Sequence, residues 1–578
     1  EYTINLGDNN WHHIAVSCNG TEINYYLDGR LINTNSSNYT KSTNAIRMGR
    51  RVDPTGSAGN YDFNGNIEEV RIWNTARTAI QIRENMCKSL TGNETGLVAY
   101  YNFDNASGNT LQDFSGNEND GTLYNMDNSD WVSSTAFNTW LNTSSNDWYV
   151  NNNWSLGSRP TSSDNVHISN FSTLPTNMNT NWNWMDIEVN NLVVPSTLSN
   201  FHVDVDEIRI SGNAYFYYPY TINSGDAIYV DGLFFADDSQ KSLFTVSDGA
   251  SLLTNGTVSG EINVQKSIAA DNQWHLVSMP NNSTTTTTFQ DFYLQEWDEV
   301  TSNWQEITDL DVTMTPGKGY SLFDVSAKTD FSFTGVPTTG DQSIEMTFNS
   351  SSVDTNGMNL VGNPYPSGIN AITVQNKYGY AYVWHPDNGP NGSYIAYPDD
   401  DYTYIASCQG FFLYTTEDKN FTLDNSYREA YNGDFQKEYT KDNLITLQTK
   451  LSEDCYDKLY IDIQDDASPN FELFNDALKL TSIGNGQSNL FSKYENTKFA
   501  VDVRPETDLI QLGFINDQNG IYSIEAANIA EEALAFIEDT KSNTFHDLSG
   551  GAYEFNWQTT DSEERFILHL KATGIDEM

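Results

Sequence analysis

The sequence has 578 residues, enough for about four domains of ordinary size. Asp and Glu total 78 against 29 Lys and Arg, so the formal net charge is −49 and the surface repels nucleic-acid phosphates and anionic lipids. Apolar residues make up 38% and aromatic residues 13%, which excludes a disordered chain. No apolar run reaches the roughly 18 residues that span a bilayer. We therefore expect a folded multidomain protein that neither binds nucleic acid nor inserts into a membrane.

The cysteines give little information about the protein's environment. Cys18, Cys87, Cys408 and Cys455 are too few for a disulfide framework, and none lies in a CxxC or zinc-type pattern. The cysteines therefore do not indicate whether the protein occupies an oxidising or a reducing compartment. Cys18 lies in a predicted strand and Cys87 just past a predicted helix, so the sequence does not decide whether these two residues pair.

The hydropathy pattern predicts an all-β fold. Most of the chain consists of short runs of Val, Ile, Tyr, Phe and Thr with a period of two, separated by clusters of Asn, Asp, Gly and Ser. This pattern is typical of antiparallel sandwiches and related folds. Helix-like periodicity is rare: we expect one short helix over residues 75–85, capped by Thr75, and a second over 525–536.

Residues 1–132 form the first predicted domain. A strand over 11–16 (WHHIAV) is followed by a hairpin over 24–32, whose Asp28-Gly29 pair suits a type I′ turn, and by a strand over 65–73 (GNIEEVRIW). In this order the segments resemble the laminin-G-like, concanavalin-like jelly-roll family, with its tryptophan–histidine strand and "YLDG" hairpin. The resemblance implies a jelly-roll sandwich. Because members of that family carry several strands before the tryptophan–histidine strand, we expect the N-terminal part of this domain to lie upstream of Glu1.

Residues 133–270 have a different character and predict a short β-solenoid. Several apolar rungs end in a glycine, at 208–212, 228–232, 244–249 and 252–256. Gly212 and Gly232 lie 20 residues apart, and Gly232 and Gly249 lie 17 apart, close to the length of one solenoid circuit. Each rung would bury its apolar face on the next.

Two further modules complete the predicted organisation. Residues 271–430 carry an internal duplication, since three segments at 274–280, 294–298 and 317–323 recur in order at 358–364, 382–386 and 408–414. We interpret this region as a duplicated β-sandwich module. Residues 431–578 contain further alternating runs and predict a C-terminal β-sandwich with one or two short helices.

The second half of the chain carries three short signatures, LVGNPYPS (360–367), QGFF (409–412) and ERFILHL (564–570). They resemble the region of large secreted Bacteroidetes-type proteins that precedes a type IX secretion sorting domain. The resemblance implies export by type IX secretion and an extracellular or outer-cell-surface location. We expect the sorting domain itself to lie beyond residue 578.

No segment of the sequence carries a catalytic motif. The eight histidines form no HExxH pattern, and the chain has no GxSxG elbow, P-loop or GxGxxG after a strand. Five of them lie in strand-like runs, where packing is the expected role: His12, His13, His167, His275 and His569. Glu68 and Glu69 are adjacent in a strand, so they point to opposite faces and cannot act as a glycosidase pair. We therefore name no catalytic residue and expect a non-enzyme, with a catalytic domain upstream of Glu1 left open.

Calcium is the more plausible inorganic cofactor, because hard cations bind the Asp, Asn and carbonyl oxygens in which the loops are rich. Oxygen-bearing side chains fall at alternate positions along the segment 113–121, and the candidate ligands are Asp113, Asn117, Asn119 and Asp120. Glu118 stands where an EF-hand requires glycine, so this is not an EF-hand. We favour the alternative, a polar hairpin loop without a cation. The acidic runs 399–401 and 204–207 are weaker candidates, expected to be solvated surface.

Two dense aromatic clusters, Tyr215-Phe216-Tyr217-Tyr218 and Trp182 with Trp184, suit either a sugar-stacking platform or a core or domain contact. We favour the core or contact.

The preferred functional hypothesis is a non-enzymatic, modular cell-surface or secreted protein, such as an adhesin. Its jelly-roll head would bind a glycan or a surface protein, and its β-rich modules would act as a stalk. Two alternatives stay open: a structural subunit of an extracellular assembly, and the non-catalytic portion of a secreted polysaccharide hydrolase or peptidase. Fold alone does not choose among them.

Overall fold

A computed structural model describes residues 7, 10–36, 46–50, 62–104, 108–141, 143, 147–168, 187–194, 207–217, 219–237, 244–268, 273–323, 330–349, 357–385, 392–396, 404–430, 444–452, 455–481, 486–528 and 533–572. Strands make up 48% of the structure and helices 7%, which confirms the all-β prediction. The chain forms two compact units, Glu1–Tyr220 with Tyr229–Phe244, and Thr221–Ile228 with Thr245–Met578. Among the described residues, no helix has the length and apolar character that crossing a bilayer requires.

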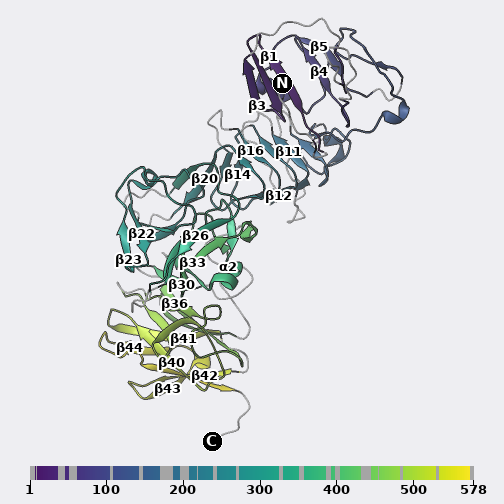
Figure 1. The fold of residues 1–578 in the computed structure, drawn as a ribbon. Helices are drawn as coiled ribbons and strands as arrows, with labels where there is room; N and C mark the ends of the chain where they lie inside the picture. Colours follow the sequence, from purple (N-terminus) through teal and green to yellow (C-terminus); the bar gives the residue numbers. More distant parts are fainter. Residues whose placement is uncertain are drawn as a thin grey trace. The chain divides into compact units, whose positions relative to one another are not determined.

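The N-terminal part of the first unit consists of small antiparallel sheets, drawn in purple and dark blue in Figure 1. They are β1 (Ile14–Cys18), β2 (Glu22–Leu27) and β3 (Arg30–Ser36) in order β1-β2-β3, the pair β4 (Val70–Trp73) and β5 (Leu97–Tyr101), and the pair β6 (Thr110–Leu111) and β7 (Gly121–Thr122). As predicted, Asp28 and Gly29 form the turn of the β2–β3 hairpin, both with positive φ, of 51° and 78°.

The first predicted helix is shorter than expected. Helix α1 spans Ala79–Asn85, and Thr78 rather than Thr75 is its N-cap. The Thr78 hydroxyl accepts from the Gln81 amide, and the Gln81 side chain accepts from the Thr78 amide, forming a capping box. The prediction placed the start of the helix too early because both Thr75 and Thr78 can act as an N-cap. Only Thr78 is followed three residues later by a glutamine, Gln81, which completes a capping box.

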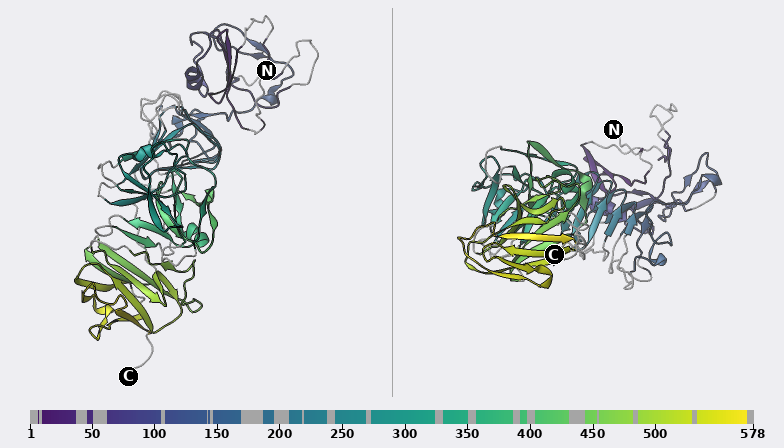
Figure 2. Two further views of the ribbon diagram at one scale, coloured as in Figure 1. Left: turned by 60° about the vertical axis from the view of Figure 1, so that its left-hand side comes forward. Right: turned by 90° about the horizontal axis from the view of Figure 1, so that it is seen from below.

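The predicted solenoid is confirmed, with about three turns. Within the first unit, short parallel strands stack in the order β16-β13-β11-β9-β8, and β10 pairs with β12. Figures 1 and 2 show these strands side by side in blue to teal. Their bounds are β8 (Asn138–Thr139), β9 (Asn165–His167), β10 (Ile187–Val189), β11 (Asn191–Val194), β12 (Glu207–Ile210), β13 (Ala214–Phe216) and β16 (Phe234–Ala236).

Close stacking explains the glycines that end two of the rungs. A Cβ on Gly212 would lie 2.4 Å from Asn191 Oδ1, and one on Gly232 would lie 2.5 Å from the Gly212 carbonyl oxygen. Any larger residue at either position would push the rungs apart.

The second unit begins with further solenoid strands and then forms several small sheets. The solenoid strands here are β14 (Thr221–Ile222), β18 (Ser251–Thr254), β19 (Val258–Ser259), the first half of β15 (Ala227–Val230) and all but the first residue of β17 (Phe244–Val246). The small sheets add β20 (Ile262–Ser267) with β25 (Asp330–Gly335), β26 (Gln342–Met346) with β33 (Lys419–Leu423), and β28 (Gly368–Asn370) with β31 (Tyr404–Ile405) and β34 (Arg428–Glu429). Helix α2 spans Ala371–Tyr378.

The duplicated segments occupy equivalent places in two four-stranded sheets. The first sheet has the order β21-β24-β22-β23 and the second β27-β32-β29-β30, so each copy threads its four strands in the same way. The strands of the first copy are β21 (Trp274–Val277), β22 (Tyr293–Asp298), β23 (Asn303–Glu306) and β24 (Tyr320–Phe323). Those of the second copy are β27 (Met358–Gly362), β29 (Ala381–His385), β30 (Ser393–Ala396) and β32 (Gly410–Tyr414).

An eleven-stranded sheet forms the C-terminal part, green to yellow in Figure 1. It folds around one apolar core that includes Leu447, Leu459, Leu490, Phe514 and Leu568. In spatial order the strands are β43 (Thr544–Asp547), β42 (Ala533–Asp539), β45 (Phe566–Ala572), β40 (Leu509–Ile515), β38 (Asn489–Tyr494), β39 (Thr497–Arg504), β36 (Cys455–Ile463), β35 (Ile445–Ser452), β41 (Gly520–Asn528) and β44 (Tyr553–Trp557), with β37 (Ala477–Leu478) on β39.

The second predicted helix, over 525–536, is wrong. Its first residues end β41 and its last residues begin β42, while 529–532 lie outside the described residues. Ile524, Ala535 and Ile537 are completely buried in the sheet's core, so alternation into this core overrides the local helix propensity.

Candidate functional site

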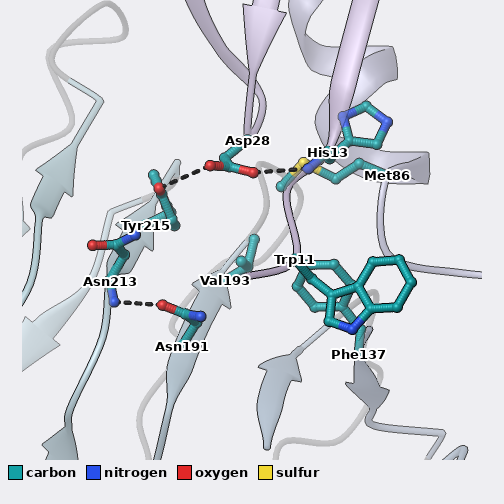
Figure 3. Close-up of a pocket in the computed structure, with 9 residues that line it drawn as sticks. All are labelled: Trp11, His13, Asp28, Met86, Phe137, Asn191, Val193, Asn213 and Tyr215. Atoms are coloured by element: carbon teal, nitrogen blue, oxygen red, sulfur yellow. Dashed lines mark hydrogen bonds between the residues drawn. The ribbon is translucent and has the colours of Figure 1, made fainter. Parts of the chain in front are cut away.

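The candidate site is a small pocket in the first unit, where the β2–β3 hairpin meets the solenoid (Figure 3). It has room for about one water molecule. Nine residues from both modules line it: Trp11, His13, Asp28, Met86, Phe137, Asn191, Val193, Asn213 and Tyr215. We call the contact around this pocket the joint.

Asp28 is the polar centre of the joint. The hairpin turn places its carboxylate below the protein surface, where Oδ1 accepts from the His13 amide at 2.8 Å and Oδ2 lies 2.8 Å from His12 Nδ1. The Tyr215 hydroxyl, from solenoid strand β13, donates to the same carboxylate at 3.1 Å. The Tyr217 hydroxyl donates to the Asp28 carbonyl oxygen. One aspartate therefore fixes its own turn and connects that turn to the solenoid (Figure 3).

Arg83 provides a second connection. Its Nε donates to the Gly29 carbonyl oxygen at 3.0 Å, and its guanidinium forms an ion pair with Asp237 of the solenoid. The guanidinium carbon lies 4.3 Å from the centre of the Tyr217 ring. Because the Arg83 and Asp237 side chains are both nine-tenths buried, water screens the pair little.

Aromatic packing surrounds these polar contacts. Tyr215 and Tyr217 are 6% and 2% exposed, and they pack with Met86 and Cys87, which directly follow helix α1. Phe216, from the same predicted cluster, packs with Phe234 and Phe244. The burial of these rings agrees with the favoured interpretation of the cluster as a core or domain contact. Three further members of the predicted clusters lie outside the described residues: Tyr218, Trp182 and Trp184.

Burial sets the protonation states at the joint. Burial, helped by Arg71, lowers the pKa of His13 to about 4, so the ring is neutral at pH 7. Burial and the nearby Asp28 carboxylate raise the pKa of the Tyr215 hydroxyl, which stays protonated and donates. These groups act as hydrogen-bonding and packing groups that hold two modules together.

The four predicted calcium ligands lie together in the loop between β6 and β7. The Asp113 carboxylate accepts from the amides of Tyr100, Ser115 and Asn119 at 2.8–2.9 Å and from the Ser115 hydroxyl at 2.8 Å. Burial opposes its ionisation, but these hydrogen bonds hold the pKa of Asp113 below its usual range. Asp113 therefore organises the loop through its own donors.

The other three predicted ligands complete the same loop. Asp120 accepts from the Asp113 amide at 2.9 Å, while Asn117 and Asn119 donate side-chain amides to the Val98 carbonyl oxygen. Within the described residues, no group of three or more His, Cys, Asp or Glu side chains is arranged to hold a metal. Calcium binding here stays a prediction.

The remaining candidates take part in local packing. Glu68 contacts Ser134, whereas Glu69 contacts Arg71 and the Tyr100 hydroxyl, so the two carboxylates have different surroundings. His167 is buried in the solenoid, and burial lowers its pKa to about 3. The acidic runs 204–206 and 399–401 and the ring of His202 lie outside the described residues.

Three of the four cysteines are unpaired within the described part of the chain. Cys18, Cys87 and Cys408 are free thiols in the described structure, so the open question of a Cys18–Cys87 disulfide is answered in the negative.

Sequence reasoning missed Arg83 and Asp237, the residues that most directly connect the two modules. They are 154 positions apart, and each looks like an ordinary charged residue in its local sequence. Only the fold brings them together.

Comparison with protein families identifies the larger part of the chain. Residues 139–570 match the model of a domain of unknown function, DUF8693. The chain belongs to the DUF8693 family. Residues 2–83 match a second model, of the concanavalin A-like lectin/glucanases superfamily, which confirms the laminin-G-like resemblance. The joint therefore connects residues of the laminin-G-like match, Asp28 and Arg83, to the DUF8693 residues Tyr215 and Asp237.

One curated relative is similar to part of the chain. Over 309 residues the chain is 27% identical to the minor fimbrium subunit Mfa5 of Porphyromonas gingivalis, an alignment that covers 45% of this chain. The chain spans about a quarter of the length of that relative. No solved structure matches the chain.

Proposed function

We propose that this protein is a non-catalytic, modular surface protein that serves as a structural or adhesive subunit of an extracellular assembly. The observation that carries the proposal is the similarity to a fimbrial subunit, together with the laminin-G-like match at the N-terminal end. In this proposal the DUF8693 region is the stalk and the laminin-G-like module is the head.

The joint supports this division of labour. A head that transmits force to a stalk needs a contact that does not open easily, and the joint combines a buried ion pair with hydrogen bonds to a buried carboxylate. Its aromatic cluster excludes water from those contacts. The YLDG turn is used in this contact, so a head ligand would bind away from Asp28 and Gly29.

The finer parts of the proposal concern ligand and export. The head would bind a glycan or a surface protein, with calcium at the loop of Asp113 as an optional cofactor. Export by type IX secretion would deliver the protein to the outer surface. The strong negative charge suits an exposed protein that must stay soluble and avoid unspecific binding to nucleic acid and anionic lipid.

The test combines localisation with binding. In the organism that encodes it, a tagged copy should be labelled on intact cells and should co-purify with a multi-subunit surface fraction. The purified chain is then applied to a glycan array with calcium and with a chelator. Glycan binding supports the adhesive role, and co-purification without glycan binding supports the structural role. A protein that stays inside the cell contradicts the proposal.

A further inference from the structure

The C-terminal sheet contains a lysine and an aspartate in direct contact inside its core. Lys479 Nζ lies 2.5 Å from Oδ1 and 2.6 Å from Oδ2 of Asp457. The side chains are only 3% and 7% exposed. Burying two full charges is costly, and a buried pair of this kind is often no more stable than an apolar replacement.

The strand pattern places Asp457 on the core side of β36. Asp457 shares its face with Leu459 and Ile461, which are completely buried, because alternate residues of a strand point the same way. Burial raises the pKa of the Asp457 carboxyl, and the neighbouring Lys479 only partly opposes this effect. Burial therefore penalises the charged form of a carboxyl group that already lies in contact with an amine.

Two further groups complete the arrangement. The Leu490 amide donates to Asp457 Oδ2 at 2.5 Å, so a backbone dipole polarises the carboxyl carbon. Thr449 lies directly opposite Asp457 in the β35–β36 register, and such pairs have Cβ atoms about 5 Å apart. In the described part of the chain, the completely buried Thr449 hydroxyl has no hydrogen-bond partner. An orphaned hydroxyl beside the pair is a group through which a proton could move.

We propose that Lys479 and Asp457 condense to an intramolecular amide cross-link. The Lys479 ammonium first passes a proton to the Asp457 carboxylate; the free amine Nζ then attacks Cγ, and the Leu490 amide stabilises the negative charge that forms on Oδ2. The Nζ–Cγ bond forms, the Cγ–Oδ1 bond breaks, and Oδ1 leaves as water with the protons lost by the nitrogen. Lysine ammonium and aspartate carboxylate thus become one neutral amide and one water molecule, without any oxidant or cofactor.

The surroundings favour the product. Condensation removes two buried charges and leaves a neutral amide, and the dry core keeps away the water that would reverse the reaction. The cross-link would tie β36 to the segment after β37 and restrict the unfolded chain, as a disulfide does. This inference does not depend on the proposed function.

The test is the intact mass of the purified full chain under denaturing conditions. We expect a mass lower than the sequence mass by one water molecule. Proteolysis should release a branched peptide that joins the segments around 457 and 479. A wild-type mass equal to the sequence mass, with no branched peptide, overturns the proposal whether or not any variant folds.

Variants locate the bond. Lys479→Arg should have its full sequence mass, and Asp457→Asn should lose ammonia instead of water, because the same amide then forms. The control Lys541→Arg removes a lysine from the half-exposed ion pair with Asp561, and should keep the loss of water. Thr449→Val, which preserves the shape, should lower the cross-linked fraction. An unchanged cross-linked fraction would overturn the role of the Thr449 hydroxyl in proton transfer.

Discussion

Removing the tyrosine hydroxyls at the joint tests how firmly it is closed. The double variant Tyr215→Phe/Tyr217→Phe keeps both rings and deletes one hydrogen bond to the Asp28 carboxylate and one to its carbonyl oxygen. A bond to a charged acceptor contributes about 1.5–3 kcal/mol and a neutral one about 0.5–1.5 kcal/mol. The joint should therefore lose about 2–4 kcal/mol, which corresponds to opening about 30- to 1000-fold more often.

Hydrogen–deuterium exchange measures this opening. The Asp28 amide, which donates to the His13 carbonyl oxygen, reports on the hairpin, and peptides covering 24–30 should exchange faster in the double variant. Tyr229→Phe is the control, because its hydroxyl contacts Glu207 within the solenoid. Unchanged exchange of the hairpin peptides in the double variant would refute the idea that these bonds hold the joint closed.

Three further predictions concern other sites. Burial would raise the pKa of Asp539, but the hydrogen bonds from Arg565 hold it well below its usual range, so this carboxylate stabilises the fold above about pH 4 and loses that effect as the pH falls. Asp539→Asn should cost about 3–5 kcal/mol at pH 7 and reduce the acid dependence of the melting temperature; an unaltered acid profile would contradict this. Arg428→Lys should destabilise the second unit by about 2–4 kcal/mol in denaturant melts, because a lysine cannot reproduce the planar contacts to carbonyl oxygens such as that of Leu252; an unshifted midpoint would count against it. Calorimetric titration with calcium should give a heat of binding that Asp113→Ala abolishes. The absence of a heat of binding with the native chain would contradict the prediction that this loop binds calcium.

Local features of the fold could be predicted from the sequence. The turn at Asp28 and Gly29 follows from the φ preferences of those residue types, and the glycine-ended rungs follow from the close stacking at Gly212 and Gly232. The repeated order of strands in residues 271–430 was visible because the same short segments recur. In each case the determining interaction lies within one rung, one hairpin or one repeated segment.

Features that depend on distant contacts could not be predicted. The segment 525–536 has helical residues but forms strands, because the sheet core needs Ile524 and Ile537. Asp113 has the residue type of a calcium ligand, yet its partners are backbone amides that only the folded loop supplies. The pairing of Arg83 with Asp237 needs the laminin-G-like module and the solenoid to meet.

The most direct test of the account asks whether this chain belongs to a surface structure. Cells carrying a tagged copy at its natural locus are treated with protease while intact, and their surface fraction is then separated and its subunits identified. The account predicts that protease removes the tag signal from intact cells and that, without protease, the chain travels with other subunits. A signal that protease reaches only after lysis, in a fraction without partner subunits, would contradict it.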